Sequence, residues 1–115
     1  MNTLNLVAVL LIISFTNCKK EGLTVDDPGC MDQLIEEFKN SDMPCESGKT
    51  IYRYKFQDQF VYVFGPGNCG ADMMSDVYDE ECNLICGLGG IAGNQSCEGE
   101  NFHEGATEET LIWKN

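Results

Sequence analysis

The sequence predicts an α+β fold in which one helix near the N-terminus packs on a small antiparallel sheet. Residues 31–38 carry apolar side chains at helical spacing, and residues 50–64 carry them at the alternate spacing of strands. The chain also has seven cysteines among 115 residues, a density typical of small exported domains whose modest cores are reinforced by disulfides. The length leaves room for one domain, so the helix and the strands belong to the same layered unit.

The predicted helix begins at Asp27-Pro28 and ends within residues 40–44. Asp27 suits the N-cap, and Pro28 suits the first helical position because the amide hydrogen that proline lacks would have no helical partner there. Cys30 lies on the apolar side of this helix, where a disulfide can reach the core. The apolar stripe, at positions i, i+3, i+4 and i+7, consists of Met31, Leu34, Ile35 and Phe38.

Two strands are predicted after the helix. In residues 50–56, aromatic side chains alternate with Arg53 and Lys55, which indicates a strand with one face in water. Residues 60–64 alternate aromatic residues with valines, so both faces are apolar, as in a central strand covered on two sides. Gln57-Asp58 separates the two strands, although it lacks the glycine of the commonest hairpin turns.

The signals are weaker in the second half of the chain. Residues 77–78 and 83–86 predict two short strands around a turn at residues 79–81. Residues 87–93 contain too many glycines for a regular element, and we expect a turned or flexible loop there.

The C-terminal part is expected to return to the sheet. Residues 94–109 predict a polar surface loop held by Cys97. Leu111-Ile112-Trp113 is apolar and predicts a final strand.

The N-terminus has the features of an export signal. Residues 6–13 form eight apolar residues without a break, which is shorter than the roughly 20 residues that a membrane-spanning helix needs. Such a run fits the core of a secretory signal peptide, although no Lys or Arg precedes it.

The segment after this run, Phe15-Thr16-Asn17-Cys18, resembles a bacterial lipobox. Asn17 and Phe15 depart from the usual lipobox residues, as the loosened lipoboxes of Bacteroidota lipoproteins do. The resemblance implies that Cys18 is diacylated and becomes the new N-terminus. The alternative is an ordinary cysteine in an uncleaved tail.

Acylation of Cys18 would divide the chain into three parts. These are a lipoprotein signal peptide at residues 1–17, a lipidated polar tether at residues 18–27 and a single disulfide-rich domain at residues 28–115. Two acyl chains hold a protein on a membrane where one does not. The expected location is therefore the bacterial cell envelope, on the periplasmic or surface face of the outer membrane.

The cysteine count agrees with this assignment, because six cysteines remain once Cys18 is set aside and an even number can pair completely. They allow fifteen pairings, which the sequence leaves open. A zinc site at Cys82, Cys86, Cys97 and His103 is the alternative, but the spacing lacks the two close pairs of structural zinc sites. The six expected disulfide cysteines are Cys30, Cys45, Cys69, Cys82, Cys86 and Cys97.

The charge limits the partners. Seven basic residues against nineteen acidic ones give a net charge of −12, which repels nucleic acid. Such an acidic surface is typical of a soluble domain, and attraction of a basic partner or of divalent cations is the functional alternative. The acidic run lacks the residue order of a calcium loop, so no metal or other cofactor is predicted. That run consists of Asp72, Asp76, Asp79, Glu80 and Glu81.

The sequence also argues against an enzyme. His103 is the one histidine and lies in a polar stretch, and no nucleophile motif such as G-x-S-x-G accompanies it. The glycines of residues 87–93 do not follow the order of a phosphate-binding loop, and no lysine follows them. An exposed binding loop is the functional alternative for this segment.

Two resemblances bear on function. The segments CMDQLIEEFKNSDMPC, IYRYKF, VYVFGPGNC, VYDEECNLICGLGGIAG and the closing LIW resemble a family of small uncharacterised Bacteroidota lipoproteins. That resemblance implies one helix with several strands, and it supplies no catalytic residues.

The second resemblance is local. The segment from Tyr78 to Leu84 is similar to the Y-x-N-x-C-x-L segment of Kazal-type protease inhibitors, with Glu80 in place of the asparagine. We therefore expect a non-catalytic binding module at the cell envelope, with a protein partner, and a protease inhibitor as the alternative. The candidate binding residues are Tyr78, Leu84, Gly87, Gly89, Gly90 and Gly93.

Overall fold

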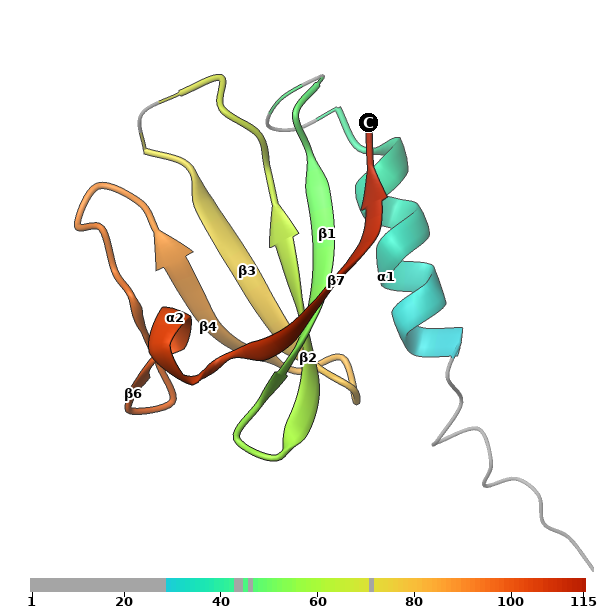
Figure 1. Ribbon diagram of the computed structural model, residues 1–115. Helices are drawn as coiled ribbons and strands as arrows, with labels where there is room; N and C mark the ends of the chain where they lie inside the picture. The colour runs from blue at the N-terminus through green and yellow to red at the C-terminus, as the bar shows by residue number, and fades with distance from the viewer. Residues whose placement is uncertain (1–28, 43–44, 46, 71) are drawn as a thin grey trace, which may run out of the picture.

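The structure, a computed structural model, describes residues 29–42, 45, 47–70 and 72–115. It has one long helix and a five-stranded sheet, so the predicted α+β fold is confirmed (Figure 1). The elements in chain order are α1 (Gly29–Asn40), β1 (Thr50–Phe56), β2 (Gln59–Gly65), β3 (Met74–Asp79), β4 (Leu84–Gly89), β5 (Ser96–Cys97), β6 (Glu100–Asn101), α2 (Phe102–Gly105) and β7 (Thr107–Lys114).

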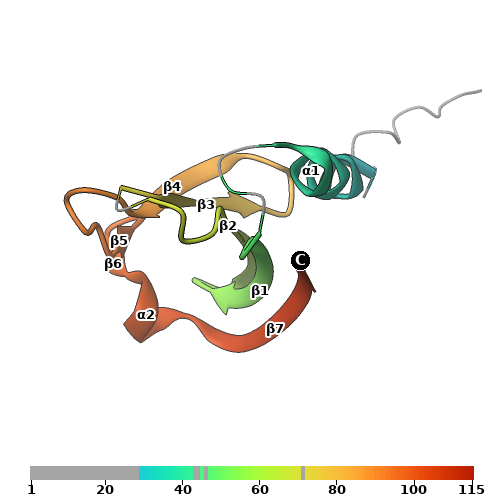
Figure 2. The same cartoon turned by 90° about the horizontal axis from the view of Figure 1, so that it is seen from above.

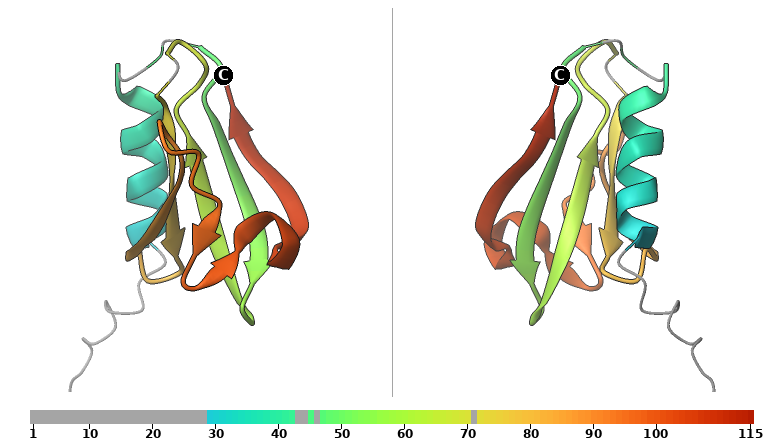
Figure 3. Two further views of the ribbon diagram at one scale, coloured as in Figure 1. Left: turned by 90° about the vertical axis from the view of Figure 1, so that its left-hand side faces the viewer. Right: turned by 90° about the vertical axis from the view of Figure 1, so that its right-hand side faces the viewer.

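The strand order of the main sheet is β4-β3-β2-β1-β7, and every neighbouring pair is antiparallel. β2 is therefore the central strand, as its two apolar faces predict. Figure 2 shows the sheet curving strongly from β4 to β7, with α1 outside the curve and α2, β5 and β6 on its inner side. Figure 3 shows α1 running along the strands rather than across them.

Alternation along the strands divides the apolar residues between two cores. On β2, Val61 faces the inner side of the sheet and Phe64 faces the outer side, beneath α1. The buried residues of the inner core are Phe56, Val61, Val77, Leu88, Cys97 and Phe102. The outer core consists of the buried residues Met31, Ile51 and Phe64, and the half-buried Leu34, Ile35, Phe38, Tyr62, Tyr78, Cys82 and Trp113 pack against them.

The helix prediction is confirmed where the structure describes it. All four residues of the predicted stripe belong to the outer core, and α1 ends at Asn40. The predicted caps Asp27 and Pro28 lie outside the described residues.

β1 and β2 are joined by the tight turn at Gln57 and Asp58. Both residues have positive φ, 53° and 65°, which is the backbone that the twist of a two-residue hairpin requires. The Gln57 side chain compensates in part for the missing glycine, because its Nε2 donates to the carbonyl of Glu98 at 3.2 Å and to Glu100 Oε1 at 3.0 Å. The turn is thereby attached to the β5–β6 hairpin.

The prediction that residues 87–93 form no regular element is wrong for the first three of them. Gly87 and Gly89 lie in β4 and pair with β3. The missing side chain of Gly87 leaves space for the Met74 side chain, and that of Gly89 leaves space for the Met73 carbonyl. The chain turns only at Gly90, where φ is +79°, and closes again where Gly93 N–H donates to the Gly90 carbonyl at 3.1 Å.

The prediction of a polar loop at residues 94–109 is also wrong in part. This stretch contains β5, β6 and α2, and Asn101 caps α2 by accepting a hydrogen bond from Glu104 N–H at 3.0 Å. The short helix places Phe102, which is 2% exposed, on the inner face of the sheet against Phe56, with ring centroids 4.9 Å apart. One aromatic residue in a polar stretch closes the inner core.

The final strand, β7, is confirmed, and it lies at the edge of the sheet beside β1. Trp113 pairs opposite Ile51 and contacts Phe38 of α1 edge to face, with centroids 6.4 Å apart. The C-terminus of the chain is thus held against the same outer core as α1.

Three disulfides use all six cysteines of the described chain. They are Cys30–Cys82, Cys45–Cys69 and Cys86–Cys97. Because Cys82 and Cys86 belong to different disulfides, the alternative zinc ligand set is not assembled.

Candidate functional site

Helix α1 is fixed to the sheet at both ends. Cys30, in its first turn, is bonded to Cys82 in the turn between β3 and β4. Cys45, just beyond the helix, is bonded to Cys69 in the connection between β2 and β3. The space between α1 and β3 therefore has covalent links near both ends, which limits how far the helix can move from the sheet.

Lys49 holds the C-terminal end of α1. Its side chain is buried, with 2% exposed, and its Nζ donates to the carbonyl oxygens of Phe38 at 3.2 Å and Ser41 at 2.7 Å. These carbonyls belong to the helix end, where backbone acceptors lack helical partners and a positive charge is favourable. The ammonium also lies 5.4 Å from the Phe38 ring centroid.

A groove of about 230 Å³ lies between α1 and strands β2 and β3. Phe64 is central to its aromatic surface, because its ring meets the rings of Phe38 and Tyr78 edge to face, each at 5.2 Å between centroids. The residues that line the groove are Leu34, Glu37, Phe38, Ser41, Phe64, Asp76 and Tyr78.

Two carboxylates, Glu37 and Asp76, border this aromatic surface. Burial raises the pKa of Asp76. Burial also raises the pKa of Tyr78, and the negative charge of Asp76 raises it further. The groove is thus an aromatic site bordered by two carboxylates.

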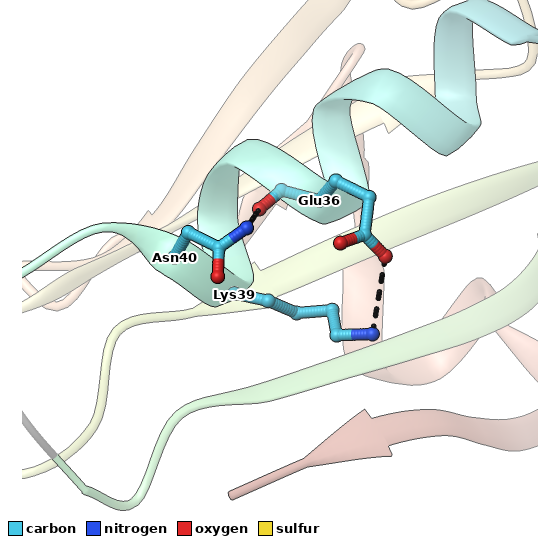
Figure 4. A network of polar contacts seen from close by, with 3 residues as sticks. All are labelled: Glu36, Lys39 and Asn40. Carbon is cyan, nitrogen blue, oxygen red and sulfur yellow. Dashed lines mark hydrogen bonds and ion pairs between the residues drawn. The ribbon is translucent and has the colours of Figure 1, made fainter.

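The nearby lysine of α1 points elsewhere. Lys39 Nζ forms an ion pair with Glu36 at 3.2 Å and lies 5.8 Å from the ring centroid of Trp113. Figure 4 shows this ion pair together with Asn40, whose Nδ2 donates to the Glu36 carbonyl at 2.9 Å. Lys39 is therefore engaged away from the groove.

An exposed apolar surface adjoins the groove on the outer face of β3 and β4. Met74 is 48% exposed and lies two residues before Asp76, so the two side chains share a face. Leu84 is 59% exposed and pairs opposite Tyr78. We call Met74, Leu84 and the two glycines between them in the register, Gly87 and Gly89, the β3–β4 platform.

The structure brings together four of the six predicted binding residues. Tyr78 lines the groove, and Leu84, Gly87 and Gly89 belong to the β3–β4 platform. The other two, Gly90 and Gly93, lie in the turn after β4. Gly90 lies against the Met74 side chain at the edge of the platform, whereas Gly93 is in open space.

Sequence reasoning missed six groove residues as binding candidates: Leu34, Glu37, Phe38, Ser41, Phe64 and Asp76. The three apolar ones among them carry the periodic pattern of core residues, so the pattern gives no sign that they also line the groove. The signal that points to Asp76 is its position at alternate spacing between Met74 and Tyr78, on the face that the helix covers.

The acidic run does not form one cluster. Asp79 organises the β3–β4 turn, since its Oδ1 accepts hydrogen bonds from the backbone N–H groups of Glu81 and Asn83, each at 2.9 Å. Asp76 faces the groove instead. Within the described ranges, no group of three or more His, Cys, Asp or Glu residues is placed to hold a metal ion.

Two other predicted features have simple placements. His103 is exposed on α2, with its ring 6.0 Å from that of Phe102. Cys18 and the apolar run at residues 6–13 lie outside the described residues. In the part of the chain that the structure describes, no helix has the length and hydrophobicity to span a membrane.

The fold and the groove define a small disulfide-bonded α+β domain with a preformed cleft on the outer face of its sheet. The chain belongs to the DUF6970 family, described as a domain of unknown function, whose model matches residues 36–115. Most of the groove lies within that range. Neither the search of curated proteins nor that of solved structures found a match.

Proposed function

We propose that this chain is a non-catalytic binding module of the bacterial cell envelope and that the groove beside α1 is its binding site. The observation that carries the binding role is the groove itself, an aromatic cleft with covalent links near both ends of its helix. A preformed site loses little conformational entropy when it binds a partner. The β3–β4 platform extends the contact surface beyond the cleft.

The envelope location depends on Cys18. The three disulfides use every cysteine from Cys30 onward, so the assignment of Cys18 to lipid leaves no unpaired thiol in the domain. The lipobox-like segment and the resemblance to small Bacteroidota lipoproteins support the same address.

The anchor is tested by the intact mass of the membrane-extracted protein, with thiol alkylation before and after reduction. A diacylated chain that begins at Cys18 and has no reactive thiol until reduction is expected. An unlipidated chain would contradict the anchor, and free thiols would contradict the disulfide scaffold.

The binding surface is tested with a matched pair of substitutions in the full chain. Leu84→Lys alters the β3–β4 platform, whereas Ile91→Lys makes the same change in the turn after β4, where Ile91 is 84% exposed. Partners cross-linked to the wild-type chain in its native membranes are expected to be lost with Leu84→Lys and kept with Ile91→Lys. The reverse pattern would place the binding surface at the glycine-rich turn.

A protease inhibitor is the second candidate function. The exposed Leu84 lies two residues after the disulfide-bonded Cys82, in the segment that is similar to Kazal-type inhibitors. Its strand is paired with β3, however, and inhibitors of that class present an extended loop to the protease. Titration of serine and cysteine proteases with the chain tests this role, and no inhibition at micromolar concentration would remove it.

A further inference from the structure

We propose that the groove binds the side chain of a lysine or arginine that projects from a protein partner. This inference rests on the proposed function and names the chemistry that the binding site recognises. It follows from the charge of the groove, its aromatic surface, its size and its neighbouring apolar platform.

The negative charge of the groove favours binding of a cation. Glu37 and Asp76 line the same cleft, and Asp76 is half-buried on the outer face of β3. An ionised carboxylate in such a place is poorly solvated unless a positive charge approaches it. A bound ammonium or guanidinium group would supply the opposite charge that the free chain lacks there.

The cations of the described chain do not fill this role. Arg53 and Lys55 lie over the ring of Phe60, at 4.7 Å and 5.4 Å from its centroid. Lys49 donates to carbonyls at the end of α1, and Lys39 contacts Glu36 and Trp113. Lys114 is exposed on the edge strand β7, which lies three strands away from β3 in the sheet. Among the described residues, the cations are therefore engaged or placed elsewhere, and the groove can accept one from a partner.

The aromatic surface suits an organic cation better than a metal ion. Phe38, Phe64 and Tyr78 present rings to the cleft, and aromatic rings attract ammonium and guanidinium groups while they also pack against the attached methylene chain. A divalent metal would instead need several oxygen ligands at short distance. The combination of two carboxylates and three rings matches the long, charged-tipped side chains of lysine and arginine.

The surroundings favour a protein as the source of that cation. The groove, at about 230 Å³, is smaller than the roughly 300–1,000 Å³ of typical small-molecule sites. Met74 and Leu84 expose apolar surface directly beside it, which a protein partner can cover while its basic residue enters the cleft. The net charge of −12 also steers basic proteins toward the chain.

The test uses short peptides and the full chain with its three disulfides formed. Amide shifts in NMR spectra are followed while acetyl-Leu-Lys-Leu-amide is added, with a control peptide in which the lysine is Nε-acetylated and thus neutral. We expect shifts at residues 34–41 and 74–78 with the lysine peptide, and at least about tenfold weaker binding of the neutral peptide. Equal binding of the two peptides would overturn the proposal.

Charge-neutral variants locate the effect. Asp76→Asn is expected to lower the affinity for the lysine peptide roughly fivefold, because it removes the half-buried carboxylate of the groove. Glu104→Gln removes the same charge from α2, on the inner side of the sheet, and should leave the affinity unchanged. Equal losses in both variants would mean that general electrostatic attraction, and not the groove, binds the peptide.

The source of the cation is tested with butylamine, which has the ammonium and a methylene chain but no flanking residues. If butylamine binds as tightly as the peptide, the ligand is a free amine and the protein-partner part is wrong. If the groove ignores both probes while Leu84→Lys still abolishes partner capture, this inference fails and the proposed function stands. If partner capture tolerates Leu84→Lys, the binding surface in the proposed function is what fails.

Discussion

The two faces of the sheet are covered by different elements and to different extents. On the inner face, β5, β6 and α2 close over an apolar core in which Phe56, Val61 and Val77 are almost fully buried. On the outer face, α1 covers part of the sheet and leaves a groove in which Glu37 and Asp76 remain. A domain that needed only stability would fill such a groove with apolar side chains, since burying a carboxylate without a partner costs free energy. This contrast supports the proposal that the inner face serves stability and the outer face binds a partner.

The largest effect is expected at Phe102, which closes the inner face. Phe102→Ala should lower the free energy of unfolding by about 3–5 kcal/mol, because it removes a buried ring and leaves a cavity. Denaturant unfolding at constant pH measures this, with Ile112→Ala on the half-exposed edge strand as the control. A loss of less than about 1 kcal/mol would mean that the inner core does not dominate stability.

The next largest effects on stability are expected from removal of two of the disulfides. Replacement of Cys30 and Cys82 by alanine opens a link across 52 residues, and the same change at Cys86 and Cys97 opens one across 11 residues. By restricting the unfolded chain, these links are worth about 4 and about 3 kcal/mol respectively, measured by denaturant unfolding.

Binding should respond to only one of these links. Loss of Cys30–Cys82 frees the start of α1 and should weaken partner capture, whereas loss of Cys86–Cys97 leaves α1 attached. Equal effects of the two changes on capture would contradict the division between the faces.

A smaller effect is expected at Lys49. Lys49→Met keeps most of the side-chain volume but leaves the carbonyls of Phe38 and Ser41 without their charged donor. We expect a loss of about 2 kcal/mol in denaturant unfolding. Lys39→Met is the matched control, since its ion pair with Glu36 is exposed and should contribute less than about 1 kcal/mol.

The smallest effect, of opposite sign, is expected at Asp76. Folding raises the pKa of this carboxyl group, so the folded chain binds its proton more tightly than the unfolded chain does. The ionised group therefore lowers stability at neutral pH, and that penalty disappears as the pH falls below the ordinary aspartate range. Asp76→Asn should raise the free energy of unfolding at pH 7 by less than about 1 kcal/mol, because solvent screens a half-exposed carboxylate.

The measurement for this prediction is denaturant unfolding of the wild type and Asp76→Asn across a pH series. The gain should shrink toward zero at acid pH. A loss of stability at pH 7 would show that Asp76 has a structural role, in conflict with a carboxylate reserved for a ligand.

The parts of the fold that the sequence predicts are those with a regular apolar period. The stripe of α1, the alternation of β1 and β2, and the apolar end of β7 each identify an element from neighbouring residues alone. The first half of β4 was predicted, but residues 87–89 were not, because the glycines carry no pattern. α2 was not predicted, because Phe102 is a single apolar residue among polar ones. For β4 the deciding interaction is pairing with β3, and for α2 it is the contact of Phe102 with Phe56 of β1.

The groove could be predicted only in part for the same reason. Tyr78 and Leu84 were predicted as binding residues from a local motif, and the structure places them opposite each other on β3 and β4. Glu37 on α1 and Asp76 on β3 line the same groove only because of how the helix lies on the sheet. Two disulfides hold the helix in that position. The sequence allows fifteen disulfide pairings and so leaves that position open.

Site-specific photo-cross-linking can determine which face of the sheet contacts a partner. A photoreactive amino acid is placed in the full chain at Met74, on the platform beside the groove, or at Glu104, on the inner side, and both positions are exposed. After irradiation in native membranes, a cross-linked protein is expected from position 74 and none from position 104. Cross-linking from position 104 alone would assign binding to the inner face and contradict the account.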